Sequence, residues 1–147
     1  MPDDPERPYT LEFYDEPGTG AQPVVEWMRK LPRYQRRAIG VALSEVLQRH
    51  EIDVCGTEWG KQLGDGLFEF RVRHDADEIV AMFTDRKPDH EPDDGPVTLR
   101  VFCHAHGRRL VLLLADYDKA ADPTEKREDR EIALARRRLH EYRQRKP

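Results

Sequence analysis

One stretch decides the fold of this chain, and it reads Lys61-Gln62-Leu63-Gly64-Asp65-Gly66-Leu67-Phe68-Glu69-Phe70-Arg71-Val72-Arg73. The Gly-Asp-Gly triplet inside it is typical of a tight turn, because glycine adopts positive φ without steric cost. After the turn, apolar and charged residues alternate with the two-residue period of a strand that has one buried face. The two predicted faces are Leu67, Glu69, Arg71 and Arg73 on one side and Phe68, Phe70 and Val72 on the other.

The charged face of this strand has two interpretations. Burying arginine is costly unless an acid pairs with it, so Arg71 and Arg73 are either surface charges, solvated or ion-paired with Glu69 and other acids, or they bind an anion. Lys61 adds a further cation on the other side of the turn. The stretch alone leaves both interpretations open.

Length and composition indicate one domain over residues 1–147, with a small core, because 37% of the residues are hydrophobic and 37% are charged. We expect residues 1–8 to form a mobile arm. Residues 85–96 contain three prolines and no apolar side chain, which predicts a disordered loop insertion. The sequence shows neither a membrane span nor a signal peptide, so we expect a cytoplasmic protein.

The formal net charge of -4 hides a strong segregation of charge along the chain. Residues 1–16 carry six acids and one base, whereas residues 27–50 and residues 134–147 each carry six bases and one acid. A basic surface on a globally acidic protein therefore remains open, although charge runs are usually solvated helix faces.

Hydrophobic periodicity predicts an α+β domain with a mostly antiparallel sheet of four or so strands, an N-terminal helical hairpin and a C-terminal helix. The last helix is expected to begin at Asp122, with Glu125 completing a capping-box-like start. The predicted elements are a strand at 9–14, helices at 23–31 and 32–50, strands at 67–73, 78–84, 97–103 and 110–115, and a helix at 122–143.

The sequence contains no glycine-rich phosphate loop, no nucleophile elbow and no zinc-type spacing, so we expect neither a metal nor a cofactor. What remains is a set of cations on neighbouring predicted strands, namely Lys61, Arg71, Arg73, Arg100 and Lys119. If the strands pair as a meander, these side chains converge and can bind a phosphate. RNA cleavage at such a place needs no cofactor, because the 2′-OH of the substrate can attack the adjacent phosphate.

A wider pattern combines the opening strand with later segments: Lys61-x-Leu63-Gly64-x-Gly66-Leu67-Phe68-Glu69-Phe70-Arg71, Leu99-Arg100-Val101-Phe102, Leu110-Val111-Leu112-Leu113, Tyr117-Asp118-Lys119, Pro123 and Glu131-Ile132-Ala133-Leu134-Ala135-Arg136-Arg137. In order and spacing this pattern, over residues 9–142, resembles the phage-derived HigB-like branch of the RelE/ParE toxin superfamily. The resemblance implies a RelE-like fold and the toxin of a type II toxin-antitoxin pair. Such toxins are commonly ribosome-dependent mRNA endonucleases, and a helix-turn-helix antitoxin neutralises them.

The resemblance also implies roles for individual residues. It indicates Arg71 and Arg100 as strand cations and Lys119 as the surviving member of a lysine pair, and we predict these three as catalytic. His104 is a further candidate, for general base, because the imidazole pKa suits that role. The predicted RNA-binding residues are Lys61, Arg73, His104, Arg136 and Arg137.

Two departures from the family pattern keep other functions open. Where relatives usually show Phe-x-Lys-Lys, this chain has Tyr117-Asp118-Lys119-Ala120, and its overall charge is acidic. Residues 75–98 also resemble an insertion between two strands. The alternatives are a non-catalytic protein that keeps the fold and an antitoxin-type partner, and a ParE-like inhibitor of gyrase.

Overall fold

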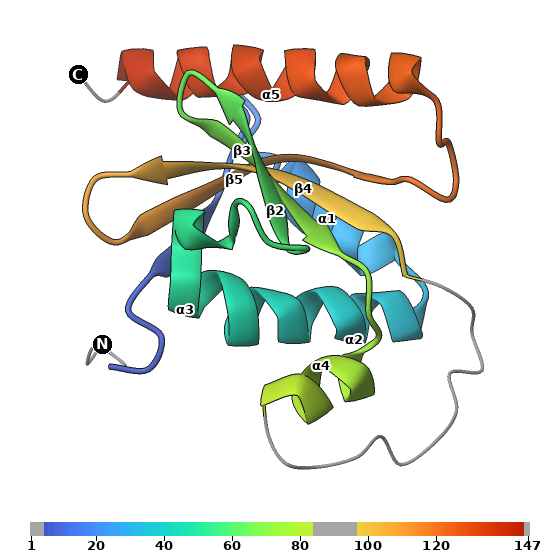
Figure 1. The fold of residues 1–147 in the computed structure, drawn as a ribbon. Coiled ribbons are helices and arrows are strands. Elements are labelled where there is room, and N and C mark those ends of the chain that lie inside the picture. The colour runs from blue at the N-terminus through green and yellow to red at the C-terminus, as the bar shows by residue number, and fades with distance from the viewer. Residues whose placement is uncertain (1–4, 84–96, 146–147) are drawn as a thin grey trace.

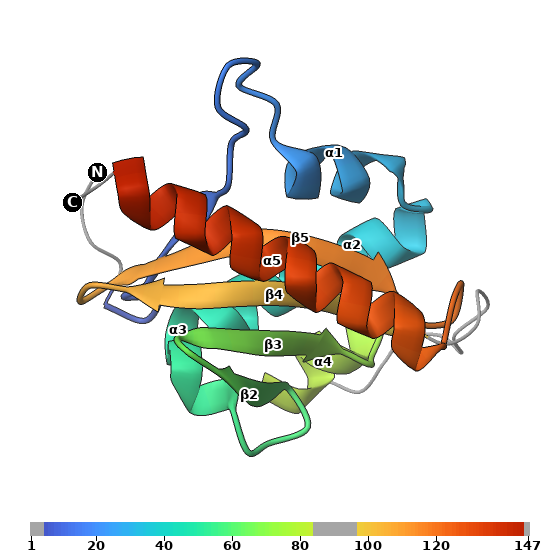
Figure 2. The same cartoon turned by 90° about the horizontal axis from the view of Figure 1, so that it is seen from above.

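A five-stranded sheet forms the middle layer of the fold, with helices on both of its faces (Figure 1). The structure, a computed structural model, describes residues 5–83 and 97–145. The long C-terminal helix covers one face of the sheet, and the earlier helices lie on the other (Figures 1 and 2). The elements are β1 (Thr10–Phe13), α1 (Pro23–Lys30), α2 (Arg33–Ala42), the π-helical turn η1 (Leu43–Leu47), α3 (Gln48–His50), the 3-10 turn η2 (Glu51–Val54), β2 (Gly60–Gly64), β3 (Leu67–Val72), α4 (Ala76–Phe83), β4 (Leu99–His106), β5 (Leu110–Asp118) and α5 (Glu125–Arg145).

The strand order in the sheet is β1-β5-β4-β3-β2. The pairs β2–β3, β3–β4 and β4–β5 are antiparallel, whereas β1 lies parallel to β5 at the edge. The α+β class and the C-terminal helix are therefore confirmed. The sheet is mixed because β1 is parallel to β5. The residues before the glycine turn form β2, a strand that was not predicted, and it pairs with β3.

The glycine turn joins β2 to β3 as the sequence indicates. Gly64, Asp65 and Gly66 all have positive φ, of 89°, 54° and 84°. An added Cβ at position 66 would lie 2.8 Å from Nη2 of Arg143, so the end of that side chain would have to shift. The turn thus depends on glycine for its backbone conformation.

The two faces of β3 pack into different halves of the core, which confirms the predicted alternation. Phe68, Phe70 and Val72 are fully buried against the side chains of α2 and η1. Leu67, on the other face, joins the cluster under α5. Other members of that cluster are Phe102, Leu112, Leu114, Tyr117, Ala135, Leu139 and Tyr142.

The strand predicted at residues 78–84 is wrong, because residues 76–83 form helix α4. The N–H of Glu78 donates to Oδ1 of Asp75 at 2.8 Å, and the N–H of Asp75 donates to Oε1 of Glu78 at 3.4 Å. This reciprocal pair is a capping box, and it stabilises the start of a helix.

The described part of the N-terminal arm contacts η1 through Arg7. Nη2 of Arg7 lies 2.5 Å from Oε1 of Glu45, and Nε of Arg7 donates to Oγ of Ser44 at 3.0 Å. The mobility expected for residues 1–8 stays a prediction. The predicted loop at 85–96 lies outside the described residues. Within 5–83 and 97–145, every helix is too short or too polar to cross a membrane.

Candidate functional site

The predicted catalytic cations lie at one end of the sheet, where β3 and β5 end and β4 begins. Arg71, near the end of β3, lies directly opposite Arg100, near the start of β4. Lys119 follows the last residue of β5, and its N–H donates to the carbonyl of Thr98 at 2.9 Å. Lys61 reaches the same region from β2, because it pairs with Glu69 in the register of the sheet.

Glu69 is the acid at the centre of these cations, and it is fully buried. Its Oε1 accepts a hydrogen bond from Nε of Arg71 at 2.5 Å and lies 3.7 Å from Nε of Arg100. Arg71 and Arg100 are thus ion-paired with Glu69, as one of the two interpretations of the sequence expected for Arg71. A buried carboxylate with such partners is tightly constrained, because either charge alone would be costly to bury.

Arg100 is buried, with 4% of its surface exposed, and Nη1 donates to the carbonyl of Leu99 at 3.2 Å. Burial lowers its pKa, and the neighbouring charges of Arg71 and Arg73 act in the same direction. Arginine nevertheless keeps its charge in proteins. Its predicted direct contact with a phosphate needs correction, because in this structure Arg100 is a buried counter-ion that supports Glu69.

Glu128, in the first turn of α5, is a residue that the sequence did not single out. Burial and a hydrogen bond with the Glu69 carboxyl raise the pKa of Glu128, while the charges of Lys119 and Lys61 act in the opposite direction. Oε2 of Glu69 has no conventional donor among the described residues.

We call this group the strand-end cluster, and it consists of Lys61, Glu69, Arg71, Arg73, Arg100, Lys119 and Glu128. Tyr117 lies beneath it, and burial together with the charges of Glu128 and Glu69 raises the Tyr117 pKa to about 12. Lys61 and Arg73 are exposed, and Arg71 and Lys119 are partly so. Since cations outnumber carboxylates, the cluster has positive charge left to attract a phosphate.

Two of the predicted RNA-binding residues lie at the opposite end of β3, at the glycine turn. Nδ1 of His104 donates to the carbonyl of Gly66 at 2.7 Å, and burial lowers the His104 pKa. Arg136, on α5, donates to the carbonyls of Gly64 and Leu63 at 3.2 and 2.8 Å. These side chains hold the turn and do not join the strand-end cluster. Arg137, the next residue on α5, is exposed.

Neither a scan against protein-family models nor a search of curated proteins finds a match for this chain. The resemblance in the motifs therefore stays a prediction.

A cavity of about 250 Å³ lies on the opposite face of the sheet, under η1 and α4. Its lining is mainly apolar and includes Val46, Trp59 and Phe83. None of the predicted cations lines it. Over the described part of the chain, His, Cys, Asp and Glu side chains do not gather in a group that could hold a metal ion. The strand-end cluster is accordingly the candidate site.

Proposed function

We propose that this chain is a toxin of the RelE/HigB type that cleaves mRNA, on the ribosome, by metal-independent attack of the 2′-OH on the adjacent phosphate. One observation carries the proposal. Cations from β2, β3, β4 and the segment after β5 surround the acids Glu69 and Glu128 at one end of the sheet. Their charge exceeds that of the acids, and phosphate is the group that arginine and lysine clusters bind best.

In the proposed reaction, Lys61, Arg73 and Lys119 hold the scissile phosphate. Arg71 keeps Nε on Glu69 and offers its remaining N–H groups to the non-bridging oxygens, because its side chain is 23% exposed. The 2′-oxygen forms a bond to phosphorus while the bond from phosphorus to the 5′-oxygen breaks. The proton of the 2′-OH passes to water, and the products are a 2′,3′-cyclic phosphate and a 5′-hydroxyl, whose proton comes from Lys119.

The proposal extends to the fold family and the partner. A first strand followed by α1 and α2, an antiparallel run of strands and a closing helix is compatible with a RelE-like domain. We propose a helix-turn-helix antitoxin as the neutralising partner and the cytoplasm as the place of action. A co-expression test follows directly: the neighbouring gene should encode a small protein that restores growth when both are induced.

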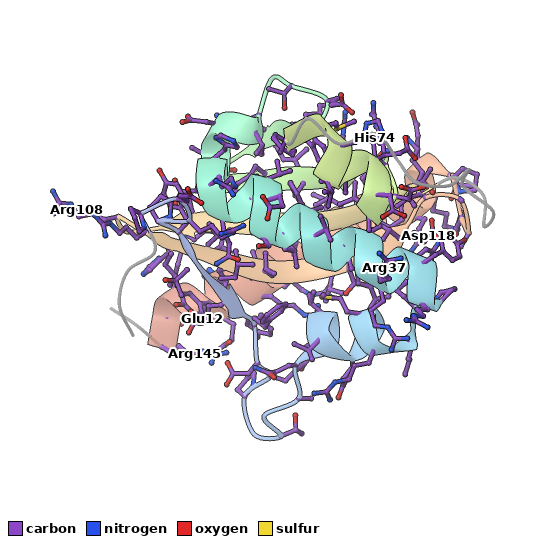
Figure 3. All side chains as sticks on the ribbon, turned by 90° about the horizontal axis from the view of Figure 1, so that it is seen from below. Glu12, Arg37, His74, Arg108, Asp118 and Arg145 are labelled. Carbon is purple, nitrogen blue, oxygen red and sulfur yellow. The ribbon has the colours of Figure 1, made fainter. Side chains whose placement is uncertain are left out.

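The decisive experiment is cleavage of a labelled RNA by the purified protein, or by translating ribosomes supplied with it. We expect cleavage that leaves a cyclic phosphate, is abolished by a 2′-deoxy group at the cut position and persists in EDTA. Lys119→Ala should slow cleavage by about 10²–10³-fold, because a charged donor at the phosphate is lost. Arg108→Ala is the matched control, since Arg108 is an exposed arginine at the far end of the sheet (Figure 3).

A second function is favoured by one specific observation, the pairing of Arg71 and Arg100 with Glu69. Cations that are already neutralised suit a protein that keeps the toxin fold and its antitoxin but no longer cleaves RNA. Wild-type protein that binds the antitoxin yet leaves translated mRNA intact, and that does not arrest growth, would establish this alternative. Growth arrest with a DNA-damage response and intact mRNA would instead indicate a ParE-like action on gyrase.

A further inference from the structure

A group of cations that the proposed reaction does not use gathers where α1 ends and α2 begins. Arg29 and Lys30 are in the last turn of α1, and α2 opens with Arg33, Arg36 and Arg37. All of these side chains are exposed. We call these residues the helix-corner cations.

A hydrogen bond places the start of α2 beside Lys119 of the strand-end cluster. Nε2 of Gln35 donates to Oδ2 of Asp118 at 3.3 Å, and Lys119 is the next residue along the chain. In Figure 3, Arg37 and Asp118 lie on the same side of the molecule. The helix-corner cations and the strand-end cluster therefore occupy the same end of the sheet.

A second contact joins α2 to the segment that follows β3. Nη2 of Arg37 lies 3.8 Å from Oδ1 of Asp77. Asp77 is in the first turn of α4, a short distance along the chain from Arg73 of the strand-end cluster. Helices α2 and α5 cover opposite faces of the sheet (Figure 1). The helix-corner cations thus continue the positive surface around the end of the sheet, from the face of α5 to that of α2.

Helix stability does not explain the cations of α2. Cations are favourable in the last turn of a helix and unfavourable in the first, because the N-terminus carries partial positive charge. Arg29 and Lys30 therefore stabilise α1. Arg33 and Arg36 have the opposite effect on α2, whose first turn contains no acid. Their position costs stability, which is typical of residues that serve binding.

We propose that the helix-corner cations bind the backbone phosphates of the substrate RNA beside the cleavage point, so that the strand runs from the strand-end cluster across the end of the sheet onto α2. This inference rests on the proposed function, because the strand that these cations hold is the substrate. Arginine binds phosphate oxygens in a bidentate geometry, and contacts to the backbone carry no sequence information. The surface therefore adds affinity for long strands without a preference for any base.

The test compares Arg33→Gln/Arg36→Gln with the charge-matched control Arg108→Gln/Arg109→Gln, which changes two exposed arginines in the turn between β4 and β5. The probes are RNAs of about three and about twelve nucleotides with a 2′-deoxy group at the cut position, because only the longer strand spans both surfaces. Arg33→Gln/Arg36→Gln should bind the longer RNA about 10-fold more weakly at low salt. The slope of log affinity against log salt should fall by about 1.4, since each phosphate contact to a single strand contributes about 0.7.

The short RNA should bind equally to wild type and to both variants, and the control should match wild type with either RNA. Arg33→Lys/Arg36→Lys keeps both charges and should keep the salt slope. Because cations at the start of a helix are unfavourable, the urea midpoint of Arg33→Gln/Arg36→Gln should not fall below that of wild type. A loss of RNA affinity in this variant therefore reports a lost contact and not a lost fold.

The outcomes separate this inference from the proposed function. Wild-type protein that cleaves no RNA would overturn the proposed function. Active wild-type protein, with Arg33→Gln/Arg36→Gln binding the longer RNA equally well, would overturn the role of the helix-corner cations alone. Weaker binding of that variant to vacant ribosomes, with unchanged affinity for the free strand, would overturn it as well, because the surface would then bind ribosomal RNA.

Discussion

The two ends of β3 use the same kinds of side chain in different ways. At the glycine turn, His104, Arg136 and Arg143 direct N–H groups at main-chain carbonyls of residues 63–66. At the strand end, Arg71 and Arg100 face the carboxylate of Glu69 instead. In Figure 3, Arg108, at the glycine-turn end of the sheet, and Asp118, at the end with the strand-end cluster, lie on opposite sides of the molecule. The glycine turn is thus held by hydrogen bonds to the backbone, and the strand-end cluster by ion pairs between side chains.

The difference matters for function because the two kinds of bond respond differently to a ligand. A main-chain carbonyl is fixed once the turn has folded. A side chain that donates to it contributes to stability and is not released when a ligand binds. A carboxylate competes with phosphate for the same guanidinium, and both bind it in the same geometry. Function is therefore expected at the strand end and stability at the turn.

The largest effect should come from Glu69→Gln. The change removes the counter-charge of Arg71 and Arg100, and Arg100 has a side chain that is 5% exposed. Breaking a buried ion pair by removing one partner typically costs about 3–5 kcal/mol, because the remaining charge is buried without compensation. Urea denaturation at pH 7 measures the loss.

The control for this prediction is the double change Glu69→Leu/Arg100→Leu. Replacing both buried charges with apolar side chains leaves only Arg71 without its partner, and the Arg71 side chain is 23% exposed, so stability should return to near the wild-type value. If Glu69→Gln were as stable as wild type, the ion pairs would contribute nothing to stability, and the contrast between the two ends of β3 would not hold.

A smaller effect is expected from Asp116→Asn, on β5 between the two ends. Burial and the charge of Glu131 raise the Asp116 pKa from 3.8 to about 7. The folded state therefore disfavours the ionised form, so stability is lost as pH rises from about 4 to about 7. At pH 8 the asparagine variant should be more stable than wild type by about 2 kcal/mol, and at pH 4 the two should be nearly equal. Paired urea titrations at both pH values check this, and an equal difference at both would contradict it.

The sequence predicted the part of the site that local periodicity controls. Alternation placed Glu69 and Arg71 on one face of a strand, and the glycine triplet placed the turn, because both signals act over a few residues. Their pairing was one of two stated outcomes. The proximity of Arg71 to Arg100 follows because residues 76–83 form a helix, so that β3 and β4 are consecutive strands and pair directly.

The sequence could not place Glu128, because its approach to Glu69 depends on where α5 crosses the sheet. All residues from 125 to 131 are charged, so no local sequence pattern distinguishes Glu128 from its neighbours. The buried position of Arg100 was also missed, since alternation shows which face a side chain occupies but not whether a later helix covers that face. Both omissions concern contacts between segments far apart in the chain.

At the starts of α4 and α5, the sequence contained an N-cap signal that was overlooked or assigned to the wrong residue. Asp75 and Glu78 have capping-box spacing and do form that box, yet the apolar residues after them were interpreted as a strand. Asp122 was expected to cap the last helix, but its Oδ1 accepts the N–H of Thr124, and Thr124 is the cap. Short apolar runs remain ambiguous between helix and strand unless the cap decides.

The smallest predicted effect is also the one that separates the two ends most directly. Arg136→Ala removes two hydrogen bonds to turn carbonyls, and Arg137→Ala removes an exposed neighbour on α5. Because the carbonyls regain water, Arg136→Ala should cost about 1 kcal/mol of unfolding free energy and speed amide exchange in the turn. Arg137→Ala should cost less than about 0.5 kcal/mol. RNA affinity should stay within twofold of wild type for Arg136→Ala, so a large loss of affinity with unchanged stability would return Arg136 to the RNA-binding surface.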